Sequence, residues 1–166
     1  RVHTHVAAHV HTPGAMHVLE LGGGPGLLAE AILGRQPADY TLLDFSAPML
    51  AMARQRNPGI TCVQRDFLDP AWPAGLGTFD AVVTMQAVHE LRHKRRAQRL
   101  YTQVHPLLAP GGLFVVSDHE PSDTRVRARD LHATAGEQHA YLAGAGYRDI
   151  TTIFTIGALY AVAARA

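Results

Sequence analysis

The chain has 166 residues, of which 47% are hydrophobic, and its formal net charge at pH 7 is +1. This length and this hydrophobic content are sufficient for one domain around a single buried core. The near-neutral charge argues against a nucleic-acid-binding protein, which usually has a strongly basic face. The single cysteine, Cys62, excludes an internal disulfide and a zinc site of several thiolates, and we expect it to be a buried, unreactive thiol.

The sequence contains no segment that resembles a membrane span or a signal peptide. No stretch reaches the roughly 18 consecutive apolar residues that a membrane helix needs. Residues 1–14 lack the apolar core of a signal peptide, so we expect a soluble, cytoplasmic protein. Four histidines in this segment have a spacing that fits a packed or frayed leading helix better than a metal site: His3, His5, His9 and His11.

The spacing of apolar residues predicts strands that alternate with helices along the chain. The Asn57-Pro58-Gly59 turn ends the second helix, and Pro110-Gly111-Gly112 separates the last long helix from a strand. The expected elements are a strand at 15–21, a helix at 26–33, a strand at 40–44, a helix at 47–56 with Ser46 as its N-cap, a strand at 60–64, a loop at 69–78, a strand at 79–85, a helix at 91–108, a strand at 113–117, and then helix, strand and strand.

This alternation predicts an α/β fold with a mostly parallel sheet and helices on both faces. Such sheets bind ligands beyond the carboxyl ends of their strands. Polar residues recur at that position in the predicted strands: Glu20, Asp44, Asp66, Gln86 and Asp118. Their repetition at one edge suggests a ligand that is rich in hydrogen-bond donors.

The first predicted strand runs into a glycine-rich turn, Gly22-Gly23-Gly24-Pro25-Gly26, before the first helix. Such a turn lets the backbone approach a ligand closely and can present free N–H groups to negative charge. A nucleoside triphosphate is excluded because no Gly-Lys-Ser or Gly-Lys-Thr follows. A nicotinamide dinucleotide is disfavoured by Leu27, which occupies the third glycine position of its fingerprint, although Asp44 could still hold a ribose. S-adenosylmethionine, with its cationic amino group near Glu20, is the third candidate.

Five segments, taken in order, resemble the motifs of Rossmann-like class I S-adenosylmethionine-dependent methyltransferases. They are VLELGGGPG at 18–26, LLDFSAPML at 42–50, QRDF at 64–67, FDAVV at 79–83 and LLAPGG at 107–112. The resemblance extends from about residue 16 to residue 164. It implies a seven-stranded sheet with an antiparallel C-terminal strand. It also implies one domain, in which 1–15 is the remnant of an N-terminal helix or cap, 16–118 the cofactor-binding half and 119–166 the substrate side.

The resemblance also implies a role for each motif residue. Glu20 and the backbone of Gly22, Gly23 and Gly24 would hold the methionine end of the cofactor. Asp44 would accept hydrogen bonds from both ribose hydroxyls. The remaining positions are Phe45 and Met49 beside the adenine, Asp66 and the Phe67 backbone at its edge, and Gln86 and Ala87 beside the sulfonium. The alternative for Phe45, Met49 and Phe67 is that they are core side chains.

Two histidines are candidate catalytic groups. His89 follows the fourth predicted strand and His119 the fifth, so either could act as a base or contact the substrate. His89-Glu90-Leu91-Arg92-His93 also matches the His-Glu-x-x-His pattern of zinc peptidases. Arg92 and the basic residues that follow are a poor environment for a dication, so we expect no metal site.

The cationic residues after this motif are expected to form a solvated face of one helix, with an anionic substrate or RNA as the less favoured interpretation: Arg92, Lys94, Arg95, Arg96 and Arg99. The polar segment 120–129 is expected to be a lid or a site of missing residues.

The overall expectation is a methyltransferase that acts on an oxygen or nitrogen atom of a small molecule, with S-adenosyl-L-homocysteine as product. We expect neither a nucleic acid nor a membrane as partner, and a homodimer is one compatible assembly. The alternatives are a cofactor-binding domain without catalysis and a nicotinamide-dependent oxidoreductase.

Overall fold

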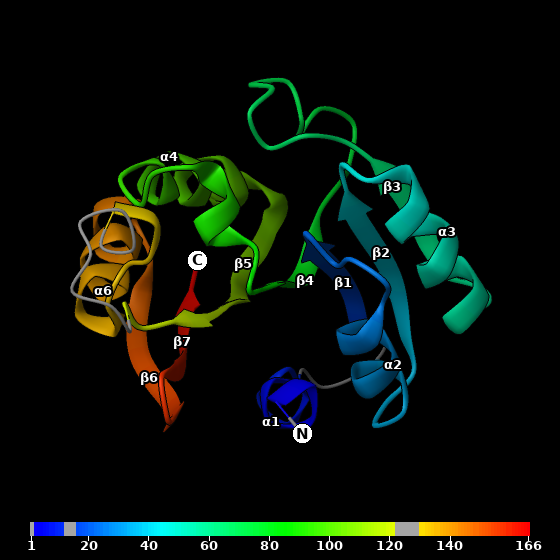
Figure 1. Ribbon diagram of the computed structural model, residues 1–166, viewed down its shortest axis with the longest axis horizontal. Coiled ribbons are helices and arrows are strands. Elements are labelled where there is room, and N and C mark those ends of the chain that lie inside the picture. Colours follow the sequence, from blue (N-terminus) through cyan, green and yellow to red (C-terminus); the bar gives the residue numbers. More distant parts are fainter. Residues whose placement is uncertain (1, 12–15, 122–129) are drawn as a thin grey trace.

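The computed structural model describes residues 2–11, 16–121 and 130–166, and in them seven strands form one sheet with the order β3-β2-β1-β4-β5-β7-β6 (Figure 1). Five neighbouring strands are parallel, and β7 runs antiparallel to both β5 and β6. The strands are β1 Met16–Leu21, β2 Ala38–Asp44, β3 Thr61–Gln64, β4 Phe79–Met85, β5 Leu108–His119, β6 Arg148–Ile156 and β7 Leu159–Arg165. The expected α/β class and the antiparallel C-terminal strand are confirmed.

Helices cover both faces of the sheet, because alternate strand residues point to opposite sides. The helices are α1 Val2–His9, α2 Leu27–Leu33, α3 Ala47–Arg56, α4 Arg96–Val104 and α6 Ala135–Gly144, with 3₁₀ turns η1 Val88–Leu91 and η2 His105–Leu107. In β5, Phe114 and Val116 pack in the cluster that includes α4 and α6, whereas Val115 packs with α1, α2 and α3. Strand β5 is therefore buried on both faces over residues 113–118, as expected for a strand inside such a sheet.

Three of the four N-terminal histidines, His3, His5 and His9, lie in a packed helix, and His11 follows its end. Val6 and Ala7 of α1 are buried in the core, and the exposed His5 and His9 lie beside Phe154 of β6, with ring centroids 5.9 Å and 6.2 Å apart. This arrangement agrees with the expected leading helix. Among the described residues, none of the helices combines the length and apolarity that crossing a bilayer requires.

The helix expected at 91–108 is present but shorter and interrupted. The chain forms η1, leaves helical geometry at Arg92 with φ 65°, and resumes as α4, which is followed by η2. Strand β5 then begins at Leu108 rather than Leu113 and includes the Pro-Gly-Gly turn, where its pairing with β4 shifts register between Phe79 and Ala81. Local periodicity could not reveal this early start, because β4 supplies the partner of Leu108 from a distant part of the sequence.

Two smaller expectations also change. Ser46 is the N-cap of α3, as expected, but its side chain makes no capping hydrogen bond. Cys62 is half-buried rather than buried, and burial raises the pKa of its thiol, which favours the less reactive protonated form. Of the segment expected to be a lid, residues 122–129 lie outside the described residues.

Candidate functional site

A cavity of about 550 Å³ opens at the carboxyl ends of the parallel strands. Its volume lies within the range of roughly 300–1,000 Å³ that small-molecule sites occupy. The expected residues that line it are Gly22, Gly24, Asp44, Phe45, Met49, Asp66, Phe67, Gln86 and Ala87. The sheet therefore brings most of the expected ligand-binding residues into one cavity.

Backbone hydrogen bonds within the protein use the N–H groups of the glycine loop. Gly22 and Gly23 both donate to the carbonyl oxygen of Leu43, at 2.8 Å and 3.2 Å. Gly24 donates to Oδ2 of Asp44 at 2.8 Å, and Gly26 donates to the carbonyl oxygen of Gly23 at 3.0 Å. The expectation that this loop presents free N–H groups to negative charge is wrong for these four residues. A loop of this kind is poorly suited to bind a pyrophosphate.

Close packing explains several of the glycines in the loop. Gly22 has φ 69°, and a Cβ atom there would lie 2.4 Å from Cβ of Ala87. Gly26 has φ 78°, and a Cβ atom there would lie 2.7 Å from Nδ2 of Asn57. A large residue at the third glycine position disfavours a dinucleotide if its side chain pushes the helix away from the strand. Leu27 is 37% exposed, so this argument against a dinucleotide is wrong. The close approach occurs at Gly26 instead, where the glycine loop packs against Ala53 and Asn57 at the end of α3.

Asp44 ends β2 with both carboxylate oxygens held in place. Oδ2 accepts the Gly24 hydrogen bond, and Oδ1 accepts a hydrogen bond from the backbone of Ser46 at 2.8 Å. Each carboxylate oxygen can accept more than one hydrogen bond, so both can still accept from a ligand in the cavity. The fixed orientation of Asp44 suits a ligand with two adjacent hydroxyl groups.

The apolar lining of the cavity is exposed. Phe45 is 66% exposed and Met49 is 39% exposed, although both are large apolar side chains. The alternative that they are core residues is therefore wrong. Phe67 is half-buried and packs edge-on against the buried Trp72, with ring centroids 5.9 Å apart. Asp66 is exposed, and its Oδ1 accepts a hydrogen bond from the backbone of Leu68 at 2.8 Å.

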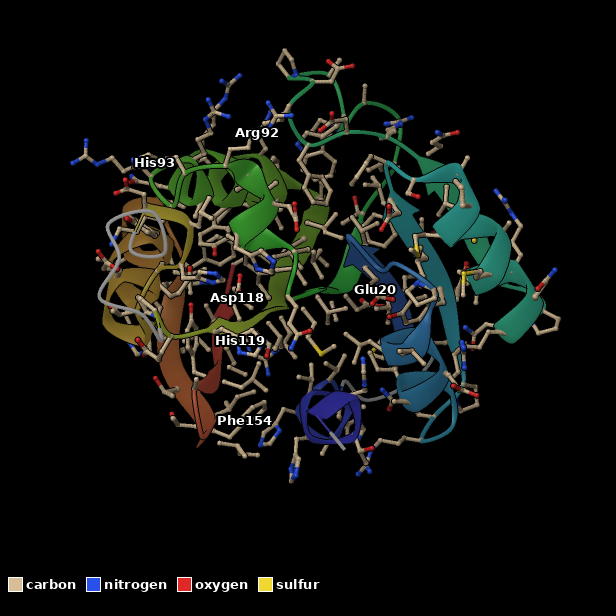
Figure 2. The ribbon with its side chains drawn as sticks, viewed as in Figure 1. Glu20, Arg92, His93, Asp118, His119 and Phe154 are labelled. Carbon is tan, nitrogen blue, oxygen red and sulfur yellow. The ribbon has the colours of Figure 1, made fainter. Side chains whose placement is uncertain are left out.

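Glu20 lies in the interior of the molecule (Figure 2), against Gly23 of the glycine loop. It is 2% exposed and is absent from the residues that line the cavity. Its Cδ would lie 2.9 Å from a Cβ atom at Gly23, and Tyr40 donates a hydrogen bond to its Oε2 at 2.9 Å. Burial raises the pKa of Glu20 to about 8, despite the opposing hydrogen bond from Tyr40. The carboxyl group is thus largely protonated at neutral pH, which weakens our charge-based reason for placing a cationic amino group beside it.

The raised pKa of Glu20 predicts a pH-dependent stability. The folded state keeps the Glu20 proton up to about pH 8, whereas the unfolded state loses it near pH 4.5, so the folded state binds more protons in between. The free energy of unfolding should therefore fall as pH rises from about 5 to 8, by up to about 5 kcal/mol, since one pKa unit corresponds to about 1.4 kcal/mol. Glu20→Gln should remove this fall, and urea unfolding at several pH values measures it.

The control for this prediction is Glu30→Gln, which removes a carboxylate of the surface ion pair between Glu30 and Arg56. This variant should keep the pH dependence of the wild type. If the free energy of unfolding changes with pH in the same way in the wild type and in Glu20→Gln, Glu20 is ionised in the folded protein across this range.

Gln86 and Ala87 close the cavity after β4. Gln86 has the unusual φ of 55° and is held by a hydrogen bond from its backbone N–H to Ser117, at 2.8 Å. Its side-chain amide donates to Nε2 of His119 at 2.9 Å. His119 therefore has one ring nitrogen engaged with a residue of the cavity wall.

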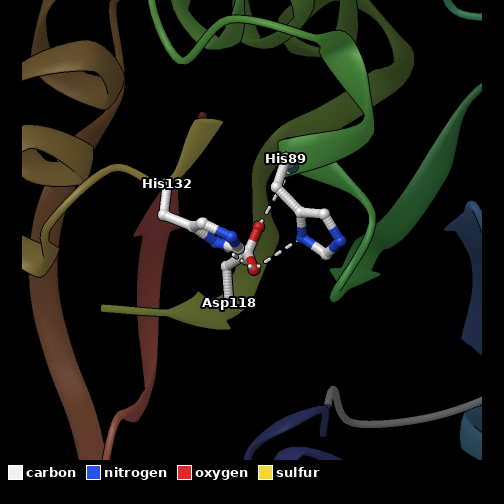
Figure 3. A group of neighbouring side chains, drawn as sticks. All are labelled: His89, Asp118 and His132. Carbon is white, nitrogen blue, oxygen red and sulfur yellow. Dashed lines mark hydrogen bonds and ion pairs between the residues drawn. The ribbon is translucent and has the colours of Figure 1, made fainter. Parts of the chain in front are cut away.

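His89 forms a hydrogen-bonded pair with Asp118, which is 2% exposed at the end of β5. Nδ1 of His89 donates to Oδ1 of Asp118 at 2.9 Å, and the backbone N–H of His89 donates to Oδ2 at 3.2 Å (Figure 3). The hydrogen bond with Asp118 raises the pKa of His89. Because the carboxylate can only accept, the neutral imidazole carries its lone pair on Nε2.

A third residue, His132, completes this cluster. Its ring lies 4.9 Å from that of His89, and its Nδ1 lies 3.8 Å from Oδ1 of Asp118. Burial lowers the pKa of His132. Sequence reasoning missed His132, because it lies in a stretch without periodicity. It named Asp118 and His89 separately without pairing them.

The His-Glu-x-x-His motif does not form a peptidase-like pair. Arg92 lies between the two histidines in left-handed geometry, so they do not lie one α-helical turn apart. His93 instead accepts a hydrogen bond from the backbone of Arg95 at 3.1 Å. In the described part of the chain, His89 clusters with Asp118 and His132, and His93 is not part of that cluster.

The cationic residues do not share one helix face, contrary to our expectation. Arg92, Lys94 and Arg95 precede α4, and only Arg96 and Arg99 lie in it. Lys94 forms an ion pair with Glu137 at 2.6 Å, and Arg92 lines the cavity. Glu90 and Arg65 also line it, and neither was predicted from the sequence to contact a ligand there.

A family model described as "Methyltransferase domain" matches residues 18–112. A trans-aconitate 2-methyltransferase of Acidovorax sp. (strain JS42) is 33% identical over 147 residues, covering 81% of this chain and 55% of that protein. An uncharacterised methyltransferase of Synechocystis sp. is 37% identical over 107 residues, covering 64% of this chain and 49% of that protein. The chain thus spans about half the length of the curated relatives that it matches.

Solved structures share the fold. An S-adenosylmethionine-dependent methyltransferase from Mesorhizobium loti superposes with a TM-score of 0.74 at 21% identity, covering 96% of this chain and 94% of that chain. Human N-acetylserotonin methyltransferase in complex with S-adenosylmethionine superposes with a TM-score of 0.75 at 19% identity, covering 99% of this chain and 50% of that chain.

Proposed function

Because the chain belongs to the family of class I S-adenosylmethionine-dependent methyltransferases, we propose that it transfers a methyl group from this cofactor to an oxygen or nitrogen atom of a small molecule. The cavity at the carboxyl edge of the sheet would hold the cofactor. The acceptor would approach beside Ala87 and Glu90, which line the cavity on either side of His89 in the sequence.

The cavity fits the cofactor of this family. The backbone N–H groups of the glycine loop already donate hydrogen bonds within the protein, so the loop suits a ligand without phosphate. The positive φ angles of Gly22 and Gly24 would let the backbone come close to that ligand. Asp44 would accept hydrogen bonds from the two ribose hydroxyls. Phe45 and Met49, both exposed beside the cavity, would cover the adenine, and Asp66 would accept from its amino group.

The methionine end would lie over the backbone of Gly22, Gly23 and Gly24. Glu20 would support this part of the loop from below, since its carboxyl group lies directly under Gly23. Gln86 and Ala87 would border the reacting end of the cofactor. When bound, S-adenosylmethionine supplies a methyl group on a positively charged sulfur.

The observation that carries the proposed acceptor chemistry is the His89–Asp118 pair. Asp118 holds the His89 ring with Nδ1 protonated, so Nε2 can accept a proton from a hydroxyl or an amine as that atom attacks. Asp118 would also stabilise the imidazolium that results. Most of the remaining rate enhancement would come from holding the two reactants in line. His119, bound to Gln86, would contact the acceptor rather than serve as the base.

The name of one relative suggests a first acceptor to test. The Acidovorax relative is a trans-aconitate methyltransferase, and Arg65 and Arg92 line the cavity of this chain, where they could bind carboxylates. A carboxylate acceptor has no proton to lose at neutral pH, so its methylation would not need His89. An acceptor screen should therefore test two groups of compounds separately. The first group is tricarboxylates, whose methylation would not need His89, and the second is small hydroxy or amino compounds, whose methylation would.

Two measurements test the proposed function. Mass spectrometry of the purified protein should find S-adenosylmethionine or S-adenosylhomocysteine retained, and transfer of labelled methyl to a metabolite extract should identify an acceptor. Tight cofactor binding without transfer to any acceptor would favour a binding domain without catalysis. Retention of a nicotinamide dinucleotide would favour an oxidoreductase.

A further inference from the structure

A cluster of three potential metal ligands lies beside the cavity, on three separate elements of the fold. His89 belongs to η1, Asp118 to β5, and His132 precedes α6 (Figure 3). The ligand atoms of all three lie within 4.8 Å of one another. Two imidazoles and one carboxylate are a common set of protein ligands for zinc and other divalent transition metals.

One nitrogen atom of this cluster has no hydrogen-bond partner. Nδ1 of His132 is buried and has no hydrogen-bond partner, which among the described residues is otherwise true only of Oγ1 of Thr84. Oδ1 of Asp118 lies 3.8 Å from this nitrogen of His132. Buried polar atoms are rarely left without a partner, and a bound ion is one way to satisfy them.

The spacing of the three atoms suits a single ion. Zinc bonds of about 2.1 Å in tetrahedral geometry place ligand atoms about 3.4 Å apart. Oδ1 of Asp118 lies 2.9 Å from Nδ1 of His89 and 3.8 Å from Nδ1 of His132, and the ligand atoms of all three residues lie within 4.8 Å of one another. The backbone N–H of His119 also donates to Oδ1 at 2.8 Å, which would orient the carboxylate as an outer hydrogen bond does in metal sites.

The position of His132 is fixed by buried contacts of the residues after it. Tyr160 of β7 donates a hydrogen bond to the carbonyl oxygen of Ala133 at 2.8 Å. Thr134 caps α6 through a reciprocal pair of hydrogen bonds with Glu137. These contacts hold the backbone immediately after His132, next to Asp118.

We infer that His89, Asp118 and His132 form a binding site for a divalent transition metal ion such as zinc, and that metal binding and the base function of His89 exclude each other. This departs from our expectation of no metal site, which was based on the His89–His93 motif. The exclusion rests on the proposed function. An ion on Nδ1 of His89 breaks its hydrogen bond to Asp118 and moves the ring proton to Nε2, so Nε2 loses its lone pair.

Zinc binding to the full chain tests the site directly and does not require an acceptor. Competition with a chromophoric chelator gives the zinc affinity, and the visible spectrum of bound cobalt reports the coordination geometry. His132→Phe keeps a ring against His89 but removes the ligand, and it should weaken zinc binding at least tenfold. His93→Phe, at the other histidine of the motif, should bind zinc like the wild type. The wild type and both variants would each carry His5→Gln and His9→Gln as a common background, so that the exposed imidazoles of α1 do not bind zinc in the assay.

The second measurement is methyl transfer to a hydroxyl or amine acceptor with and without zinc. Zinc should inhibit the wild type and His93→Phe, and His132→Phe should require at least tenfold more zinc for the same inhibition. Equal zinc affinity of the wild type and His132→Phe would overturn the site. Normal turnover of the zinc-loaded wild type would overturn the exclusion.

The two proposals can fail separately. If no acceptor is methylated but zinc binding still depends on His132, the metal site is supported and the proposed activity is not. If His132→Phe melts at a lower temperature than the wild type, His132→Gln replaces it and should show the same loss of zinc binding.

Discussion

Asp44→Ala should weaken S-adenosylmethionine binding about a hundredfold. Asp44 is proposed to accept hydrogen bonds from both ribose hydroxyls, and a hydrogen bond to a charged group contributes roughly 1.5–3 kcal/mol. The loss of two such bonds corresponds to about 3 kcal/mol, and about 1.4 kcal/mol is a tenfold change in affinity. The variant also leaves the backbone N–H groups of Gly24 and Ser46 without their present acceptor, which loosens the cavity wall. Isothermal titration calorimetry with the cofactor and with S-adenosylhomocysteine measures the effect.

Asp80→Ala is the matched control for this experiment. Asp80 also accepts a backbone hydrogen bond, from His17 at 2.8 Å, but it lies at the opposite end of β4 from the cavity. It should therefore bind the cofactor like the wild type. If Asp44→Ala also binds like the wild type, and both variants are folded by circular dichroism, the cofactor does not use this cavity in the proposed way.

His89→Ala should reduce methyl transfer to a hydroxyl or amine acceptor by roughly 10²–10⁴-fold, the usual contribution of a general base. Cofactor affinity should change little, because His89 is absent from the residues that line the cavity. His93→Ala is the control, since His93 belongs to the same sequence motif but lies outside the cluster with Asp118. Single-turnover rates at saturating cofactor separate this effect from binding.

The acceptor decides how this result is interpreted. With a carboxylate such as trans-aconitate as acceptor, His89→Ala should retain most of its turnover, because no proton must be removed. Full turnover of His89→Ala with a hydroxyl or amine acceptor would rule out His89 as the base. A matching test of His119→Ala would then decide whether the second histidine has that role.

The core of the fold could be predicted because its signals are local. Buried parallel strands are short apolar runs between turn residues, and strands β1 to β4 were placed within a few residues of their ends. The polar residue after each strand then followed from the shared direction of the strands. This is why Asp44, Asp66 and Gln86 were correctly placed at one edge, where they line the same cavity.

What failed depended on contacts between distant residues. The helical pattern after residue 91 is interrupted by the positive φ of Arg92, for which the sequence offers no glycine as a signal. Glu20 looked like its neighbours at the strand ends, but its carboxyl group points behind the loop toward Tyr40. His132 approaches His89 and Asp118 only because β5, η1 and the start of α6 meet in space, and no local spacing records that meeting.

The internal hydrogen bonds of the glycine loop have a consequence for the speed of the catalytic cycle. Since Gly22 and Gly23 donate hydrogen bonds to Leu43 and Gly24 to Asp44, the protein itself holds the shape of this edge of the sheet. A preformed edge requires no ordering of the loop when a fresh cofactor enters or a spent one leaves. Exchange at this edge would then be limited by diffusion and by the breakage of ligand contacts.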